Sequence, residues 1–379
     1  MPRRPVVAFD VTPLAGFRTG IGNAVASTYA AVTAPERGVA TVPFALGLRT
    51  PRHAASLPAG TRFVRVPTRA LLQAWTRADH PSIDRVIRPA TVLHATNYVV
   101  PPSRLPTVAT VYDTTYARFP ELVTPVVRQF ARVLRRAVAR GATLHTGAQS
   151  VAAELDELYG PGLLDAGRIA VVPFGIPPLG PSAPSRSAVA APMGGAPFVL
   201  ALGTIEPRKQ LPELVRAFAI VASAMPDVRL VIAGPDGPDR PALDAAITRL
   251  DPAVRERVIV AGAVTDLERR ALLDEARVLA YPSRYEGFGF PVLEAMAAGT
   301  PVVATAAGSI PEVAGDAARL VALGDVDALA GAIVEVLTDD VVAHDLAARG
   351  VVRAQQFTWE RTGRGLVEIY ERLAATVTS

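Results

Sequence analysis

Short apolar runs alternate with helical stretches along both halves of the chain, and this alternation is the feature that most restricts the fold. The runs are VVAFDV from Val6, ATVPFAL from Ala40, RFVRVP from Arg62, TVATVYD from Thr107, IAVVPF from Ile169, FVLALG from Phe198, RLVIAG from Arg229, RVIVAGAV from Arg257, RVLAYPS from Arg277 and PVVATA from Pro301. Most are continuously apolar, as in parallel strands that are buried on both faces. The pattern predicts the α/β class, with doubly wound parallel sheets.

The stretch PPLGPSAPSRSAVAAPMGGAP, from Pro177 to Pro197, interrupts this alternation and has the composition of a linker. We therefore expect an N-terminal Rossmann-like domain over residues 1–177, a linker over 178–197 and a C-terminal Rossmann-like domain over 198–356. Residues 357–379 are expected to form an amphipathic helix that can pack back on the N-terminal domain. Two such domains facing across a cleft would bind ligands at the carboxyl ends of their strands.

Charge and composition narrow the classes of partner. The first 180 residues carry a net charge of +10 and the remainder −6, which suggests two domains with different partners. The arginines are not interleaved with aromatic residues, so nucleic acid is not expected. The absence of cysteine excludes disulfides and thiolate nucleophiles. Because Asp10 interrupts the first apolar run and no later run is long enough to span a bilayer, we expect a cytoplasmic protein.

Two carboxylates, Glu286 and Glu294, flank a glycine-rich segment at the predicted start of a helix. Gly287 and Gly289 lack a Cβ, so their amides can lie against a ligand, and a helix N-terminus suits a phosphate. A carboxylate can accept two hydroxyl donors, as the vicinal diol of a ribose or hexose offers. Alternatively, Glu294 only stabilises the helix dipole and the glycines only form a turn. The combination of acids, glycines and Pro291 favours a ligand site.

Lys209 is the only lysine in the chain, beside 38 arginines. Together with Arg208 it follows the strand FVLALG, where a compact ammonium and a guanidinium suit a diphosphate leaving group. The alternative is a lysine on a solvated face. Gln210 after the lysine excludes a P-loop. The D-x-D formed by Asp325 and Asp327 lies where a helix is expected to begin, so we interpret it as a cap, and no metal site is predicted.

The chain resembles the retaining glycosyltransferases of family GT4, which have the GT-B fold. The stretch from Glu286 to Glu294 matches the E-x7-E pattern of that family. GTIEPRKQLPELVRAFA, from Gly203, is similar to the donor-phosphate segment of the branch rich in bacterial mannosyltransferases. LHATNYVVPP from Leu93, VYDTTYARFPE from Val111 and RTGIGNAV from Arg18 resemble N-terminal segments of the family. The resemblance covers nearly the whole chain.

The resemblance implies a role for each matching position. Glu294 would hold the ribose of the donor, and Glu286 would hold hydroxyls of the donor sugar. Arg208 and Lys209 would neutralise the departing diphosphate, so these two residues and Glu286 are the expected catalytic groups. The residues expected to bind the donor are Gly20, Ile21, Gly22, Thr204, Gly287, Phe288, Gly289, Phe290 and Glu294. Those expected to contact the sugar or the acceptor are Tyr112, Asp113 and His94.

Two positions depart from the family pattern. Thr204 stands where many relatives have an arginine, and Arg208 is a candidate to replace it. Tyr112 stands where many relatives have a histidine, and a tyrosine can donate a hydrogen bond to a sugar but cannot be a cation. The segment Gly20–Gly22 is expected to approach the donor diphosphate as a loop, with a plain helix-entry turn as the alternative.

The chemistry that the resemblance implies is transfer of a hexose with net retention, for which a mannose-like sugar is the first expectation. The donor would be a nucleoside diphosphate sugar, GDP-linked in the first instance and otherwise UDP- or dTDP-linked. The acceptor would be a hydroxyl of a glycan, glycolipid or natural product. No cofactor and no metal are expected, because cations would stabilise the leaving group. The alternatives are a sugar-nucleotide epimerase or other GT-B-like enzyme and a non-catalytic nucleotide-sugar-binding protein.

The segment 124–140, TPVVRQFARVLRRAVAR, suggests a partner surface. At helical spacing its arginines fall on one face and its apolar residues on the other, without an acid on the basic face. Such a helix fits contact with the inner face of a membrane and a lipid-linked acceptor. An ordinary core-packed helix with a solvated charged face is the alternative.

Overall fold

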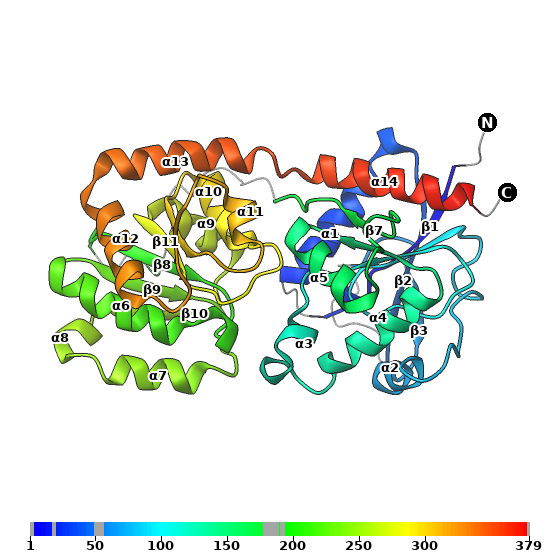
Figure 1. Cartoon of the computed structure of the whole chain (residues 1–379), viewed down its shortest axis with the longest axis horizontal. Helices are drawn as coiled ribbons and strands as arrows, with labels where there is room; N and C mark the ends of the chain where they lie inside the picture. The colour runs from blue at the N-terminus through cyan, green and yellow to red at the C-terminus, as the bar shows by residue number, and fades with distance from the viewer. Residues whose placement is uncertain (1–3, 17–19, 49–56, 177–188, 190–193, 377–379) are drawn as a thin grey trace. The chain divides into compact units, whose positions relative to one another are not determined.

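The computed structural model describes residues 4–16, 20–48, 57–176, 189 and 194–376, and the chain forms two compact units. Unit 1 comprises Met1–Gly175 and Phe357–Ser379, and unit 2 comprises Ile176–Gln356. Each unit has its own parallel sheet with helices on its faces (Figure 1). Most of the linker expected at 178–197 lies outside the described residues.

The sheet of unit 1 has seven strands in the order β3-β2-β1-β4-β5-β6-β7, and every paired neighbour is parallel. The strands are β1 (Val6–Asp10), β2 (Ala40–Gly47), β3 (Arg62–Arg65), β4 (Val92–Ala95), β5 (Thr107–Thr110), β6 (Thr143–Thr146) and β7 (Ile169–Val171). The α-helices are α1 (Gly20–Val32), α2 (Thr68–Trp75), α3 (Thr115–Arg118), α4 (Phe130–Ala139), α5 (Gln149–Tyr159) and α14 (Trp359–Ala375). The predicted doubly wound parallel sheet is therefore confirmed for this half.

Helix α14 belongs to unit 1 although it follows the whole of unit 2 in the sequence. It packs on α1 and β4, and its residues Leu366, Ile369 and Tyr370 are buried in the same core as Val7 and Phe9 of β1. Burying side chains of this size stabilises the unit by about 2 kcal/mol each. The core of unit 1 is thus built from two distant parts of the chain.

A hydrogen-bonded chain of buried polar groups ties α14 to the sheet. The hydroxyl of Tyr370 lies 2.6 Å from Nδ1 of His94, and Nε2 of His94 lies 2.7 Å from Oγ1 of Thr110. The Thr110 hydroxyl also lies 2.9 Å from Nδ1 of His145, and Nε2 of His145 donates to the carbonyl oxygen of Val172 at 3.0 Å. With both imidazoles neutral, each of these side chains has a hydrogen-bond partner. Burial favours the neutral form, and it lowers the pKa of His145 to about 4.

The sheet of unit 2 has six parallel strands in the order β10-β9-β8-β11-β12-β13. The strands are β8 (Phe198–Leu202), β9 (Arg229–Ala233), β10 (Val258–Gly262), β11 (Val278–Tyr281), β12 (Val302–Thr305) and β13 (Arg319–Val321). The helices are α6 (Leu211–Ala224), α7 (Arg240–Thr248), α8 (Pro252–Arg255), α9 (Asp266–Glu275), α10 (Phe290–Ala298), α11 (Ile310–Ala314), α12 (Val326–Thr338) and α13 (Asp340–Ala354). The strand order reverses between β8 and β11, which is the ligand-binding position in doubly wound sheets.

The two faces of this sheet are covered by different helices. Val199 of β8 and Ala280 of β11 pack with Phe218 of α6 and Ile333 of α12 in one continuous core. Helices α9, α10 and α13 lie together on the other face (Figure 1). The carboxylate of Asp325 accepts a hydrogen bond from the Ala328 amide, which confirms the expected cap of a helix.

The arginine-rich helix is shorter than the segment 124–140. A short 3-10 turn, Val127–Gln129, precedes α4, and Thr124 lies before Pro125, a position that disfavours helical backbone. Its apolar face is buried as predicted, through Val133, Leu134, Ala137 and Val138. The basic face is not free of acids, because Asp79 forms ion pairs with Arg136 at 2.9 Å and with Arg140 at 2.5 Å.

Candidate active site

The carboxyl ends of β8 and β11 bring together charged residues from two distant segments of unit 2. Lys209 lies in a 3-10 turn, Pro207–Lys209, that follows β8, and Glu286 lies in the loop that follows β11. Because β8 and β11 are neighbours at the reversal of strand order, their loops leave the sheet beside each other. The amide of Arg284 donates to the carbonyl oxygen of Arg208 at 2.9 Å and joins the two loops directly.

Lys209 and Arg208 both contact the same carboxylate oxygen of Glu286. Lys209 Nζ lies 2.7 Å from Oε1 of Glu286, and a guanidinium nitrogen of Arg208 lies 2.5 Å from the same oxygen. Lys209 and Glu286 are buried, and Arg208 also donates to the carbonyl oxygen of Tyr285 at 2.9 Å. Glu206 is a second carboxylate of the group, with Oε2 3.5 Å from a guanidinium nitrogen of Arg208. The switch point therefore holds two cations and two carboxylates, and the cations are the groups suited to an anionic ligand.

The electrostatics of this cluster follow from burial and pairing. Burial alone would raise the pKa of Glu286, but the positive charges of Arg208 and Lys209 outweigh it and lower the pKa to about 2. Burial lowers the pKa of Lys209, and the carboxylate of Glu286 opposes this effect. The carboxylate of Glu286 and the two cations therefore favour each other's ionised forms.

Tyr281, in the last position of β11, completes the surroundings of Lys209. The Lys209 ammonium donates a hydrogen bond to the Tyr281 hydroxyl and lies 4.4 Å from the centroid of the Tyr281 ring. Tyr281 is 2% exposed, and burial raises the pKa of its hydroxyl well above the ordinary value. A neutral hydroxyl and an aromatic face both stabilise a buried ammonium.

The backbone of Glu286 is fixed by the loop that follows β12. Its carbonyl oxygen accepts from the amide of Ser309 at 2.9 Å and from the Ser309 hydroxyl at 3.0 Å. Gly308, with φ +56°, lies so close that a Cβ there would be 2.3 Å from this carbonyl oxygen. Only glycine fits at position 308, because a side chain there would push the backbone of Glu286 out of place.

The glycine-rich segment enters α10 in the manner expected. Gly289 adopts φ +84° as the residue before the helix, and a Cβ there would lie 2.5 Å from Cδ1 of Ile310. Gly287, Phe288 and Gly289 are buried, and Phe290 is half-buried with its ring centroid 5.0 Å from that of Phe288. The first amides of α10 have no acceptor within their own helix, as at any helix start.

Glu294 lies in the interior of α10 and is paired with a residue that the sequence motifs did not include. It is 8% exposed, and Arg269 of α9 donates from Nη2 to its Oε2. Burial raises the pKa of Glu294, Arg269 lowers it, and Asp266 adds to the increase. Thr204, the other expected donor residue in unit 2, lies half-buried in the loop after β8, where its Cγ2 is 3.1 Å from a Cβ built on Gly237.

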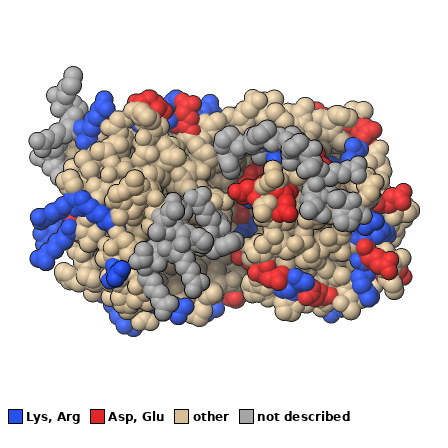
Figure 2. All heavy atoms as spheres, turned by 180° about the vertical axis from the view of Figure 1, so that it is seen from behind, with Lys and Arg blue, Asp and Glu red and all other residues tan. Residues whose placement is uncertain are grey.

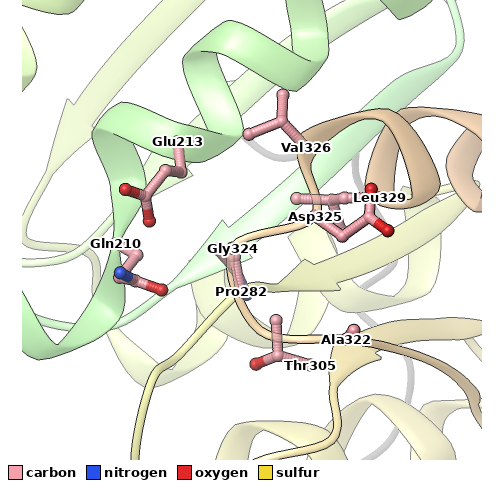
Figure 3. Close-up of a pocket in the computed structure, with 9 residues that line it drawn as sticks. All are labelled: Gln210, Glu213, Pro282, Thr305, Ala322, Gly324, Asp325, Val326 and Leu329. Carbon is pink, nitrogen blue, oxygen red and sulfur yellow. The ribbon is translucent and has the colours of Figure 1, made fainter.

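A separate recess lies at the same edge of the sheet, between the starts of α6 and α12. Figure 3 shows its lining, which is formed by Gln210, Glu213, Pro282, Thr305, Ala322, Gly324, Asp325, Val326 and Leu329. Its volume is about 10 Å³, which is room for one water molecule and not for a sugar. The recess therefore does not form a substrate pocket by itself.

Of the candidate residues of unit 1, His94 lies in β4, and Tyr112 and Asp113 follow β5. Both ring nitrogens of His94 are taken by Tyr370 and Thr110, and the side chain is 0% exposed, so its place here is in the core. Tyr112 is 6% exposed, and its ring stacks on Phe174 with 5.0 Å between centroids. Asp113 is half-buried and accepts from the Thr115 amide at 2.9 Å.

The segment Gly20–Gly22 is the first turn of α1, not the loop that was expected, because the helix already begins at Gly20. Arg18 and Thr19 of the same motif lie outside the described residues. The first amides of this helix, like those of α10, lack acceptors within the helix. An approach of this turn to a donor stays a prediction.

Comparison with known proteins places these features in a family. The family model described as "Glycosyl transferases group 1" matches residues 196–339, the region that contains the cluster of Lys209, Arg208 and Glu286. The chain is 30% identical over 317 residues to the glycogen synthase of Mycobacterium tuberculosis, a match that covers 79% of this chain and 73% of that protein. The chain belongs to the glycosyl transferases group 1 family.

Other relatives match shorter parts of this glycosyltransferase chain. It is 36% identical over 178 residues to the O-antigen chain mannosyltransferase B of Escherichia coli, which covers 46% of each protein. This chain therefore matches less than half the length of that relative. The structure is similar to that of Anabaena HepE in complex with UDP and glucose, with a TM-score of 0.72, 18% identity and coverage of 96% and 99% of the two chains. The GT-B fold predicted from the sequence is confirmed.

Proposed function

We propose that this protein is a retaining glycosyltransferase that moves a hexose from a nucleoside diphosphate sugar to a hydroxyl of a glycan, glycolipid or natural product. The observation that supports this most directly is the shared contact of Lys209 and Arg208 with Glu286 at the strand-order reversal of unit 2. A mannose-like sugar on GDP is the first candidate, in keeping with the named mannosyltransferase relative. UDP- and dTDP-sugars are the other candidates, and HepE has been crystallised with UDP.

In this proposal the two cations act on the diphosphate as its bond to the anomeric carbon breaks. Negative charge then grows on the leaving oxygen, and preorganised positive groups in a water-poor site stabilise that charge strongly. The cations serve where a metal ion would otherwise serve, so the reaction is proposed to be independent of added metal. Glu286, held by both cations, orients hydroxyls of the donor sugar, and an oxygen of the diphosphate accepts the proton of the acceptor.

Binding of the donor would divide between two carboxylates. Glu294 would accept hydroxyls of the ribose, which is remote from the reacting carbon and binds alike in ground and transition states. Backbone amides from Gly287 to Phe290 would line the sugar and phosphates. Gly20, Ile21, Gly22, Tyr112 and Asp113 of unit 1 are proposed to complete the donor and acceptor sites.

The test uses the enzyme with GDP-mannose, UDP-glucose and dTDP-glucose, each with and without a glycan or glycolipid acceptor. Release of nucleoside diphosphate and the mass of the products are measured in the presence and absence of EDTA. We expect glycosylated acceptor with one of the donors and no effect of EDTA. Epimerised nucleotide sugar without acceptor would show an epimerase, binding without turnover would show a binding protein, and loss of activity in EDTA would refute metal independence.

Kinetics of two variants test the division between the carboxylates. Glu294→Gln should mainly raise KM for the donor and weaken binding of the bare nucleoside diphosphate. Glu286→Gln should mainly lower kcat. Normal binding and turnover in both variants would refute the assigned roles.

We also propose that α4 brings unit 1 to an anionic membrane surface, which would suit a lipid-linked acceptor. Arg128, Arg132 and Arg135 are exposed, whereas Arg136 and Arg140 are engaged by Asp79. Arg132 and Arg135 lie on α4 opposite its buried apolar face, and Arg128 lies in the 3-10 turn before the helix. In the part of the chain that the structure describes, none of the helices has the length and apolar character needed to cross a bilayer. Figure 2 shows a further group of basic residues at the edge of unit 1.

A further inference from the structure

The pair formed by Arg269 and Glu294 joins two helices at the proposed nucleotide site. Arg269 is in the first turn of α9, and Glu294 is in α10, which packs against α9. The carboxylate side chain is 10% exposed and the guanidinium side chain 30% exposed, so this is a largely buried ion pair and not a surface pair. A buried pair of this kind holds its partners in one geometry, because separating them would leave a charge without compensation.

The pair is made through one atom of each partner. Nη2 of Arg269 donates to Oε2 of Glu294, whereas a guanidinium commonly binds a carboxylate through two nitrogens and two oxygens. Among the described residues, no group hydrogen-bonds Oε1 of Glu294, and Nε of Arg269 is buried without a partner. One edge of the carboxylate is thus held by the protein, and the other is available to a ligand.

We propose that Arg269 is the positioning residue for ribose recognition: it holds Oε2 of Glu294 so that the carboxylate presents its free edge to the vicinal diol of the nucleotide. This inference rests on the proposed role of Glu294. It adds to that role a residue that the glycine-rich motif does not contain.

The charges around Glu294 support a second consequence of this pairing. Burial raises the pKa of Glu294 and Asp266 raises it further, whereas Arg269 lowers it; both charged groups come from α9. Removal of the guanidinium would therefore raise this pKa and leave less ionised carboxylate near neutral pH. An ionised carboxylate is the stronger acceptor for hydroxyl groups, so recognition of the diol would become dependent on pH.

The experiment compares ribonucleotides with analogues that lack the diol. Calorimetry gives Kd for GDP and UDP and for their 2′,3′-dideoxy forms with the wild-type protein and the variants Arg269→Gln, Arg269→Lys and Glu294→Gln. Hydrogen bonds to a charged group predict a preference of about tenfold or more for the tighter-binding ribonucleotide in the wild type. Arg269→Gln should reduce this preference to about threefold or less at pH 6.5 and regain part of it at pH 8.5. Arg269→Lys, which keeps the cation, should retain most of the preference.

The adjacent arginine provides a matched control. Arg270 pairs with Asp274 on the same helix, 2.7 Å from Nε to Oδ1, and the proposal gives it no role in ribose recognition. Arg270→Gln should keep the wild-type preference at both pH values. The substitution Arg270→Gln should destabilise α9, and thermal denaturation of all variants would measure that effect separately.

The possible outcomes separate this inference from the proposed function. If Glu294→Gln keeps the wild-type preference, Glu294 does not bind the ribose, and the assigned role and the inference both fail. If Glu294→Gln loses the preference and Arg269→Gln keeps it, only the inference fails. If Arg269→Gln does not fold, the comparison uses Arg269→Lys and the control Arg270→Gln. Equal loss of the ribose preference in these two variants would overturn the inference, because such a loss would not be specific to the ion pair.

Discussion

Lys209 and Glu286 are 77 residues apart in the sequence, yet Nζ of the lysine lies 2.7 Å from Oε1 of the glutamate. The contact forms because β8 and β11 are neighbours and their loops leave the same edge of the sheet. This pair is held by the Tyr281 hydroxyl, by the guanidinium of Arg208 and by Ser309, whose amide and hydroxyl both donate to the carbonyl oxygen of Glu286. Its properties can be tested one residue at a time.

Lys209→Ala should lower turnover by about a hundredfold. Loss of one positioned charge next to a developing anion commonly costs about 3 kcal/mol of transition-state stabilisation. Steady-state kinetics with saturating donor would measure the change, with circular dichroism to show that the fold is intact. Arg240→Ala is the control, because Arg240 pairs with Asp244 of α7 and with Asp236 in the loop before it, away from the cluster. Near-native turnover in folded Lys209→Ala would refute a role in the reaction.

Tyr281→Phe should shift the alkaline limb of the rate profile to lower pH. The change keeps the ring beside Lys209 and removes the hydroxyl that accepts a hydrogen bond from the protonated ammonium. Burial already lowers the pKa of Lys209, and loss of this acceptor would lower it further, so the cation would be lost earlier as pH rises. The dependence of kcat on pH measures the shift. Tyr29→Phe, which removes a hydroxyl that contacts Thr41 in unit 1, should leave the profile in place.

Gly308→Ala should destabilise unit 2 and reduce activity together. The added Cβ would lie 2.3 Å from the carbonyl oxygen and 2.8 Å from the amide nitrogen of Glu286, at φ +56°. We expect a loss of at least about 2 kcal/mol in the free energy of unfolding, measured with urea. Gly331→Ala is the opposite case: it lies in α12, and beyond the backbone of its own helix no atom lies within 4 Å of the new Cβ, so it should gain up to about 1 kcal/mol. Equal stability of the two variants would refute the packing argument.

Reversal of charge at Arg128, Arg132 and Arg135 should strongly weaken binding to anionic vesicles. Each basic residue near such a surface contributes about 1 kcal/mol, so the triple Glu variant should bind at least about a hundredfold more weakly. Sedimentation with phosphatidylserine vesicles and with neutral phosphatidylcholine vesicles measures this. A triple Glu variant at Arg216, Arg240 and Arg249 of unit 2 has the same net charge and should bind like the wild type. Equal loss in both variants would mean that only net charge matters.

The sequence predicts the architecture well and overlooks three strands. β4 (Val92–Ala95), β6 (Thr143–Thr146) and β13 (Arg319–Val321) were not among the predicted strands, because each is short and carries polar or charged residues. The histidines of β4 and β6 are compatible with a buried sheet only through their hydrogen bonds with Thr110 and Tyr370. These partners lie on β5 and α14, far from the histidines in the sequence, so a local sequence pattern cannot show them.

The candidate site was predictable where the chemistry is local and was not where it depends on the fold. Lys209 and Glu286 were selected by composition and spacing, and the structure brings them together. Tyr281 has the sequence of an ordinary strand residue, and its contact with Lys209 arises only when β8 and β11 pair. Arg269 is one of two adjacent arginines on an amphipathic helix, and only the packing of α9 on α10 distinguishes it from Arg270.

The position of α14 has a consequence for synthesis of the protein. Unit 1 draws Leu366 and Tyr370 into its core, but these residues follow the 181 residues of unit 2, Ile176–Gln356, in the chain. While the ribosome makes unit 2, the α1 face of unit 1 has no helix to cover it, and Tyr370 is not there to bond His94. Unit 2 is contiguous and can fold as soon as it emerges. Unit 1, which is begun first, can therefore be completed only after the whole of unit 2 has been made.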